Sequence, residues 1–429
     1  MRARTAVTLA ILALAGLAAS GFAGSASAAS HERGTEGGGC VRPYSDASPW
    51  NTPIGDAPVY AADSASRIAQ INGALTSDPT QFTYPLYNAA TGRRAAKVKI
   101  LRALSQIRDG GAGLLNEKRG TLRIPLPKGA KASAETGQLI VVDQKTGREW
   151  GVFGLERKRK GFTGLFGYRF STRTDGIPAI GADGAGLASR AGASYLAGLV
   201  RACEITRGSI DHALALAYDS PSVAYITPLR GTNGSDGTPA ALPIGARVQL
   251  DPALSEADLT AGGCKGTCLI MARALQQYGA FIVGRSGSPK IYVEHSFSAK
   301  WAGRMRRASA SAIPVESLRV LDLTGQLRIT RKLKHTKPRA GKRLSASIVV
   351  APPDVDVGSR GTVFCEAEVG KDELKPVQEL IKTLPSGNDR ATCAWRIPGG
   401  SRGKEVNFLV HVVYQHGGAR ADLTKRIGR

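Results

Sequence analysis

The sequence predicts a mainly β protein, in which a sandwich- or jelly-roll-like domain with a few helices precedes a small immunoglobulin-like (Ig-like) β-sandwich. Three observations support this fold class. The 429 residues include 52 Gly and 22 Pro but only 6% aromatic residues, which favours strands and loops over a helical bundle. The hydrophobic share of 42% is enough for a packed core, which excludes wholesale disorder. Short apolar runs separated by Gly- and Pro-containing turns recur along the chain.

The larger domain is expected over residues 46–324, and a β-hairpin is its clearest local signal. Two apolar runs, Gly137–Asp143 and Arg148–Phe153, flank the turn-forming residues Gln144–Gly147, a pattern typical of strand, turn and strand. Further strands are expected over the runs Leu122–Leu126, Ile210–Tyr218, Ser222–Ile226, Arg247–Leu250 and Lys290–Val293.

Two segments of this domain have the apolar spacing of helices. The first helix is predicted over Ala61–Leu75 and the second over Cys268–Tyr278, where Gly279 follows as a C-terminal glycine should. The Gly-rich segment Gly181–Gly186 lacks the G-x-G-x-x-G spacing of a phosphate-binding turn, so we expect a loop there.

The C-terminal residues 325–429 are expected to form the Ig-like sandwich, after a break between about Ile313 and Arg328. Four alternating runs predict its strands: Leu344–Val350, Gly361–Glu368, Ala391–Ile397 and Val406–Tyr414. Trp395 follows Cys393 by two residues, unlike the arrangement in antibody domains, so the likeness concerns the architecture alone.

The N-terminus has the pattern of a secretory signal peptide over residues 1–28. Arg2 and Arg4 precede the apolar stretch Ala6–Ala19, and Ala26–Ala28 supplies an A-x-A cleavage site. We therefore expect an extracellular protein, released or held at the cell wall by charge, with a flexible leader over residues 29–45. Later apolar runs fall short of the about 18 residues that a membrane-spanning helix requires.

Six cysteines in an exported chain predict three disulfides. Cys365 and Cys393 lie together near the C-terminus, and Cys264 and Cys268 can close a small loop, which leaves Cys40 and Cys203 for the third bridge. A zinc site lacks support because the C-x3-C pair has no nearby His or second Cys pair. We expect neither a metal site nor a cofactor.

The charge is the most unusual property of the chain. The 58 Lys and Arg residues against 34 Asp and Glu give a net charge of +24, and the isoelectric point is about 10.1. Basic runs occur at Arg157–Lys160, Arg304–Arg307 and Arg331–Lys334. They favour an anionic polysaccharide or cell-wall polymer as partner, although a merely solvated basic surface is the alternative. Specific nucleic-acid binding is not expected, because no recognised nucleic-acid-binding motif accompanies the charge. We expect a monomer.

The densest polar segment runs from Arg201 to Tyr218. If a strand begins at Ile210, His212 lies on one sheet face and can act as a general base. Arg201 can then bind a substrate carboxylate, while Glu204 orients or protonates. That set suits removal of a proton next to a uronate carboxylate. The alternative is a hydrogen-bonded structural histidine beside a local ion pair.

Tyr292 and Glu294 form a second candidate pair, because alternation places them on one face of a strand. Tyr292 can serve as an acid, and Arg230 is a further candidate for substrate binding. The alternative is an edge strand with a solvated face. Hydrolysis needs two carboxyl groups at a defined separation, and no sequence spacing selects a pair among Asp143, Glu149, Glu204, Asp211 and Glu294.

The chain resembles a set of uncharacterised exported actinobacterial proteins, in which an SPWNxPI-type β-rich domain precedes an Ig-like stalk. The matching segments are Ser48–Ile54, Gly198–Arg201 with Glu204, Ile210–Ala213, Pro243–Arg247, Ala274–Gly279, Pro338–Lys342 and Cys393–Pro398. The resemblance covers most of the mature chain and implies architecture and export, but no activity.

Two functions follow as hypotheses. The first is a secreted carbohydrate-active protein that acts on or binds an acidic polysaccharide, as a lyase or a hydrolase. The second is a non-catalytic cell-wall-binding or adhesion protein. An enzyme should gather Arg201, Glu204, His212 and either Tyr292 or Arg230 in one cleft, whereas a binding protein should leave them scattered, with His212 buried.

Overall fold

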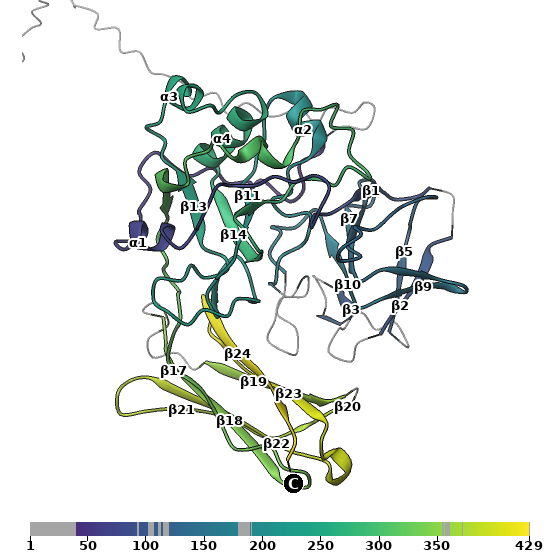
Figure 1. The fold of residues 1–429 in the computed structure, drawn as a ribbon, viewed down its shortest axis with the longest axis vertical. Coiled ribbons are helices and arrows are strands. Elements are labelled where there is room, and N and C mark those ends of the chain that lie inside the picture. The colour runs from purple at the N-terminus through teal and green to yellow at the C-terminus, as the bar shows by residue number, and fades with distance from the viewer. Residues whose placement is uncertain are drawn as a thin grey trace, which may run out of the picture. The chain divides into compact units, whose positions relative to one another are not determined.

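The structure is a computed structural model, and most of its regular secondary structure is β-sheet (Figure 1). It describes residues 40–91, 94–101, 107–109, 113–114, 120–178, 189, 191–353, 356, 361–370 and 372–428. The expected signal peptide, the first part of the leader and the Gly181–Gly186 segment lie outside these residues. The mainly β fold class is confirmed.

Two sheets near the start of the chain pack on each other. The first has the order β1-β6-β7-β10-β3-β4. Its strands are β1 (Leu86–Asn88), β3 (Ile107–Asp109), β4 (Gly113–Leu114), β6 (Leu139–Asp143), β7 (Arg148–Phe153) and β10 (Phe166–Ser171). The second has the order β5-β2-β9-β8. Its strands are β2 (Ala96–Ile100), β5 (Thr121–Ile124), β8 (Glu156–Lys158) and β9 (Gly161–Gly164). Buried Val98 and Leu122 of the second sheet meet Val141 and Val152 of the first.

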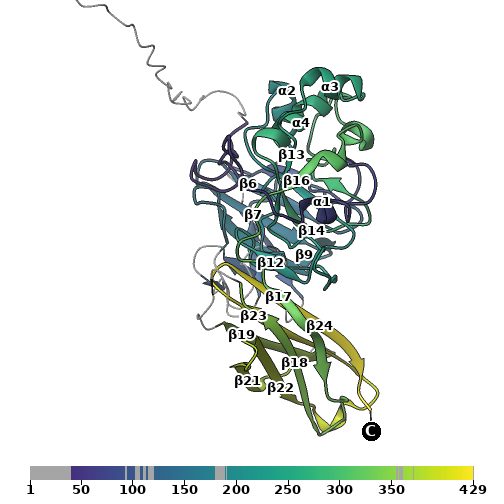
Figure 2. The same cartoon turned by 90° about the vertical axis from the view of Figure 1, so that its left-hand side faces the viewer.

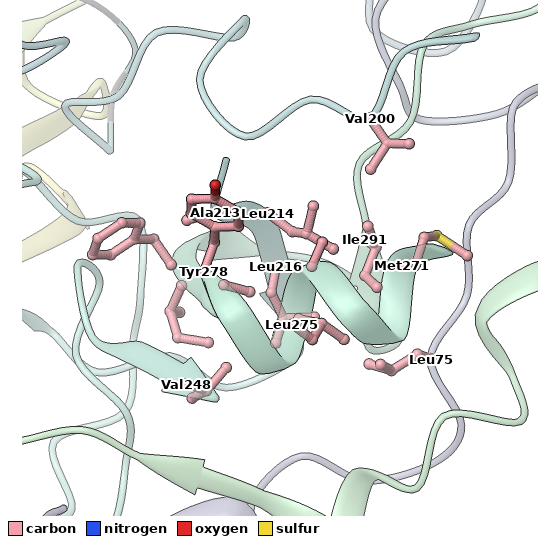
Figure 3. Packing of buried hydrophobic residues seen from close by; sticks show 14 of the residues in the cluster. Leu75, Val200, Ala213, Leu214, Leu216, Val248, Met271, Leu275, Tyr278 and Ile291 are labelled. Carbon is pink, nitrogen blue, oxygen red and sulfur yellow. The ribbon is translucent and has the colours of Figure 1, made fainter. Parts of the chain in front are cut away.

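A third sheet holds the largest core. Its order is β15-β11-β14-β13-β16, and its strands are β11 (Leu214–Tyr218), β13 (Arg247–Leu250), β14 (Ala280–Arg285), β15 (Lys290–Ile291) and β16 (Leu318–Val320). The accompanying helices are α1 (Ser64–Ile68), α2 (Ala202–Arg207), α3 (Glu256–Ala261), α4 (Thr267–Gln277) and the 3-10 turns η1 (Arg307–Ala310) and η2 (Val315–Ser317). Met271 and Leu275 of α4 lie beside Leu214 and Leu216 of β11 in this core (Figure 3).

The C-terminal residues form a two-sheet sandwich (Figure 2), one sheet of which is extended by strand β12 from earlier in the chain. One sheet has the order β17-β18-β22-β21, with β17 (Arg328–His335), β18 (Arg343–Ala351), β21 (Pro376–Thr383) and β22 (Asp389–Arg396). The other has the order β12-β24-β23-β19-β20, with β12 (Ala224–Ile226), β19 (Thr362–Val369), β20 (Asp372–Glu373), β23 (Glu405–Val413) and β24 (Gly417–Arg426). The 3-10 turn η4 spans Gly399–Ser401. Buried Trp395 and Phe408 meet between the sheets.

The local predictions succeeded where a strong turn or cap signal existed. The hairpin is confirmed as β6 and β7, with Asp143 paired to Arg148. The second helix is confirmed as α4, and Gly279 after it has φ +69°. All three disulfides are confirmed: Cys40–Cys203, Cys264–Cys268 and Cys365–Cys393.

Two predicted elements were wrong in extent. The helix expected over Ala61–Leu75 ends at Ile68, because the chain turns at Gly73 with φ +94° and buries Leu75 from a loop. The strand expected from Ile210 begins only at Leu214, because the backbone N–H of Ala213 bonds to the Trp50 carbonyl instead of a sheet partner.

The SPWN segment has a structural role. Trp50 packs edge-on against Phe281, with ring centroids 4.7 Å apart. The Asn51 amide donates to the carbonyls of Pro43 and Ser45, at 2.8 and 2.9 Å, and so fixes the preceding loop. Buried side chains with these contacts explain the motif without assigning it any chemistry.

Candidate functional site

Arg201, Glu204 and His212 come together, as the sequence predicted for a site, but they do so inside the protein. The Glu204 carboxylate accepts hydrogen bonds from the Arg201 guanidinium at 2.5 Å and from His212 Nε2 at 2.9 Å. Arg201 also donates to the Val41 carbonyl at 2.6 Å. Exposed fractions of 7% for Arg201, 0% for Glu204 and 3% for His212 leave little room for a substrate. We call these three residues the buried ion cluster.

The hydrogen bonds of His212 occupy both of its ring nitrogens. Nε2 faces the Glu204 carboxylate, and Nδ1 lies 2.9 Å from the Ala213 carbonyl oxygen. Neither nitrogen is left to take a proton from a substrate. This geometry, together with the late start of β11, supports a structural role for His212 instead of the expected role as a base.

Glu204 carries the compensating negative charge. Burial raises its pKa, but the charges of Arg201 and His212 and their hydrogen bonds outweigh burial and hold the pKa well below its usual range. The cluster therefore stays ionised, and through Val41 and the Cys40–Cys203 disulfide it fastens the start of the described chain to α2.

The other two predicted residues lie elsewhere. Arg230 donates to the Gln415 carbonyl at 3.1 Å and so contacts the C-terminal sandwich. Tyr292 lines a cavity that does not include the buried ion cluster or Arg230. Of the five residues proposed for the site, only Tyr292 lines this cavity.

Three tyrosine rings form the wall of this cavity. Tyr84 stacks on Tyr292 with ring centroids 4.9 Å apart and on Tyr195 at 4.8 Å. Against the larger effect of burial, the Gln138 side chain acts to lower the pKa of Tyr84 and of Tyr195, and the Tyr84 side chain acts to lower that of Tyr292, so polar groups of these residues lie near one another. The Thr136 hydroxyl donates to Gln138 Oε1 at 2.7 Å. The stacking of the three rings and this bond to Gln138 restrain the wall.

Burial keeps these phenols neutral. It raises the pKa of Tyr195 to about 12, raises the pKa of Tyr84 well above its ordinary value and also raises that of Tyr292. Neutral hydroxyls can donate and accept hydrogen bonds at physiological pH.

Lys290 brings a positive charge to the same wall. Its ammonium donates to the carbonyls of Gln81 and Phe82, both at 2.7 Å. It also lies 5.6 Å from the centroid of the Tyr292 ring and 5.8 Å from that of Phe82. Burial lowers the pKa of Lys290 to about 8, although Asp78 and Glu135 act in the opposite direction. We call Phe82, Tyr84, Gln138, Tyr195, Lys290 and Tyr292 the tyrosine pocket.

The wider cavity is electrostatically uneven. Arg285, Arg307 and Asp78 line it, and Arg307 and Asp78 both lie near enough to act on the pKa of Lys290. Glu366, Glu368 and Asp422, from strands β19 and β24, also line it, together with Arg420, which pairs with Asp422 at 3.7 Å. An anionic ligand is therefore favoured near Lys290 and Arg307 and disfavoured at Glu366 and Glu368.

A buried carboxyl group lies behind the pocket. The Glu149 carboxylate accepts from the hydroxyls of Ser194 and Tyr44, the latter at 3.1 Å. Burial raises its pKa to about 7, against the effect of these hydrogen bonds. Ser194 lines the cavity but Glu149 does not, so Glu149 supports the wall from within.

A second cationic feature lies on the β5-β2-β9-β8 sheet. Lys97 of β2 lies directly opposite Arg123 of β5, and Lys99 follows on the same face. Alternation places Lys158 and Glu156 of β8 on that face too, and these two side chains form an ion pair. Lys97, Lys99, Arg123 and Lys158 are all exposed, and like charges directly opposite each other, as in Lys97 and Arg123, destabilise a sheet. We call Lys97, Lys99, Arg123 and Lys158 the basic sheet face.

Sequence reasoning found Tyr292 but missed its partners. Lys290 had a usable signal, because it precedes Tyr292 by two residues and strand alternation places both on one face. Tyr84 and Tyr195 had none, because isolated bridges between Tyr84 and Glu294 and between Val200 and Val293 join segments far apart in the sequence.

Comparisons with known proteins add little to this picture. No protein-family model matches the chain, and no curated protein matches it. Among solved structures, titin M4 in its trigonal form is similar over 25% of this chain and 99% of the titin chain, with 14% identity and a TM-score of 0.17. Within the described residues, no helix is long and apolar enough to cross a membrane.

Proposed function

We propose that this protein is a secreted carbohydrate-binding protein that holds an acidic polysaccharide, with one sugar residue in the tyrosine pocket. Pockets for small ligands combine apolar and aromatic walls with a few fixed polar groups. Stacked phenol rings can contact the apolar face of a sugar, while their hydroxyls and Gln138 can bond to its hydroxyl groups. The pocket therefore has the chemical groups that a sugar requires.

The observation that carries the acidic specificity is the environment of Lys290. A buried ammonium group is costly unless an opposite charge compensates it. Both hydrogen-bond partners of Lys290 are neutral carbonyl oxygens. Asp78 and Glu135 are near enough to raise its pKa, but none of the described carboxylates forms an ion pair with it. A ligand carboxylate would supply that direct ion pair.

The basic sheet face supports the same partner. Its exposed charges attract a polyanion over a distance of about 10 Å at moderate ionic strength. Long-range attraction of this kind concentrates the polymer near the protein, whereas the tyrosine pocket recognises one residue of it.

Elimination by a lyase is the second candidate function, and Lys290 is the observation that favours it. With a pKa of about 8, part of the Lys290 population is neutral near pH 8 and has the lone pair of a base. This alternative replaces the expected base, His212, with a residue that lines the cavity.

The test measures binding of polygalacturonate and of uncharged dextran by isothermal titration calorimetry. We expect wild type to bind polygalacturonate alone, and Tyr292→Phe and Lys290→Met to weaken binding by about ten-fold or more. His212→Gln is the matched control outside the pocket and should bind as wild type at temperatures where it is folded. Absorbance of unsaturated uronates, recorded in parallel, would reveal a lyase. Equal affinity for both polymers, or none for polygalacturonate, would refute the proposal.

A further inference from the structure

Phe82 combines two unfavourable properties. Its φ is +51°, in the left-handed region that side chains other than glycine rarely adopt. Its side chain is nevertheless 56% exposed, so the strained backbone does not serve to bury the ring. The other described non-glycine residues with positive φ are Tyr44, which is buried at 6% exposure, and Ala302, whose small side chain is exposed. Backbone strain that brings no burial points to a functional constraint.

Hydrogen bonds from the side chains of Lys290 and His295 restrain the loop around Phe82. The Lys290 ammonium donates to the carbonyls of Gln81 and Phe82 at 2.7 Å. His295 Nε2 lies 2.9 Å from the Thr80 carbonyl oxygen, while its Nδ1 accepts from a backbone N–H, so Nε2 is the donor. These bonds over-determine the loop, which is the condition under which a strained residue persists.

The Phe82 N–H adds a further restraint, because it lies 3.3 Å from a Glu135 carboxylate oxygen. The backbone of Phe82 is thus bonded on both of its peptide groups. Phe82 lines the cavity together with Tyr84 and Tyr292, and its ring lies 5.8 Å from the Lys290 ammonium. The loop therefore presents an aromatic side chain at the cavity from a backbone that is fixed before a ligand binds.

We propose that Phe82 is the stacking platform of the tyrosine pocket, on which the ring of a uronate residue packs while Lys290 receives its carboxylate. This inference rests on the proposed function and deepens it by naming a specificity-determining residue. The Lys290 ammonium lies 5.6 Å from the centroid of the Tyr292 ring and 5.8 Å from that of the Phe82 ring. A sugar on the Phe82 ring is therefore close to the one ammonium group of the pocket.

The same arrangement explains why Lys290 is buried. Its ammonium fixes the Phe82 carbonyl and supplies the charge that selects an acidic sugar. One residue thereby couples the position of the aromatic platform to the recognition of the carboxylate. A neutral sugar would gain the stacking contact but not the charge interaction, so the platform favours a uronate.

The test uses Phe82→Gly in the full chain, with an oligogalacturonate as the probe and isothermal titration calorimetry as the readout. Glycine relieves the left-handed strain and removes the ring. We therefore expect an unchanged or higher melting temperature together with affinity weakened by about ten-fold or more. Phe82→Trp should keep the affinity within about three-fold of wild type, because it retains an aromatic face.

Leu380→Ala is the control. Leu380 is also an exposed large apolar residue, at 47%, but it does not line the cavity, so its truncation should leave the affinity unchanged. Wild-type affinity in Phe82→Gly would overturn the platform while leaving the pocket intact. Equal losses in Phe82→Gly and Leu380→Ala would overturn it as well. If wild type binds no oligogalacturonate, the proposed function fails and the platform with it.

Discussion

The buried ion cluster and the tyrosine pocket differ in whether a positive charge has a directly bonded counterion. In the cluster, Glu204 compensates the charge of Arg201 at hydrogen-bonding distance and also bonds to His212. In the pocket, Lys290 has neutral carbonyl partners, lies near Asp78 and Glu135 without forming an ion pair with either, and lines a cavity. A buried charge with a directly bonded counterion is complete without a ligand, whereas a charge at a cavity wall without one can gain it from solution. The difference identifies the first as structural and the second as the place where an anion binds.

The largest effect is expected from breaking the cluster. Glu204→Gln leaves the buried Arg201 guanidinium without its counterion and should lower the free energy of unfolding by about 3–5 kcal/mol. Denaturation by urea, followed by circular dichroism, measures it. Polygalacturonate affinity of the folded variant should remain at the wild-type value, and a selective loss of binding at full stability would reverse the roles of the two regions.

Glu149, the buried carboxyl group behind the tyrosine pocket, should make the free energy of unfolding depend on pH. Because the pKa of Glu149 is raised from 4.5 to about 7 in the folded protein, the folded state holds a proton that the unfolded state releases. Its contribution is fully present below about pH 4.5 and is lost as pH rises to about 7, a change of about 3 kcal/mol. Glu149→Gln should remove this contribution from urea-denaturation series at several pH values. A variant with the same pH profile as wild type would show that Glu149 is ionised inside the protein.

Lys290 should make polygalacturonate binding depend on pH, whereas the buried ion cluster, which does not line the cavity, should not. Its pKa of about 8 means that the positive charge is present below pH 8 and disappears above it. We expect the affinity for polygalacturonate to fall by about ten-fold between pH 7 and pH 9 in wild type, equivalent to about 1.4 kcal/mol. Lys290→Met should bind weakly and equally at both pH values. A pH-independent wild type would separate acid recognition from Lys290.

The smallest effect is expected from the basic sheet face. Replacing Lys97, Lys99 and Arg123 together by Gln should weaken polygalacturonate binding by only about two- to five-fold at low salt and leave it unchanged at high salt, because exposed charges are screened. Titrations at two salt concentrations measure the difference. A larger, salt-independent loss would move the binding site from the tyrosine pocket to this sheet.

The sequence predicted what local signals specify. The hairpin of β6 and β7 has its own turn residues, helix α4 has its terminal Gly279, and the pairing of Cys365 with Cys393 follows from their place in the chain. The mainly β class follows from composition. The export signal lies outside the described residues and stays a prediction.

The site was harder to predict because contacts between distant segments build it. His212 looked like a sheet residue until the backbone of Ala213 proved to bond to Trp50. The pocket forms only where the Tyr84 segment lies beside the Tyr292 segment, which follows more than 200 residues later. A local run of polar residues in the sequence does not predict such a long-range contact. Spacing alone therefore drew attention to a dense ionic cluster, although charges that lie close together in the sequence can neutralise one another in the fold.

The most direct test of the central claim is a crystal structure of the protein with a bound oligogalacturonate. We predict a sugar ring against Phe82 and Tyr292, with its carboxylate within hydrogen-bonding distance of Lys290 Nζ and with the Arg201–Glu204–His212 cluster unchanged. An oligomer bound at that cluster, or one lying only along Lys97, Lys99 and Arg123, would contradict the assignment of the tyrosine pocket as the binding site.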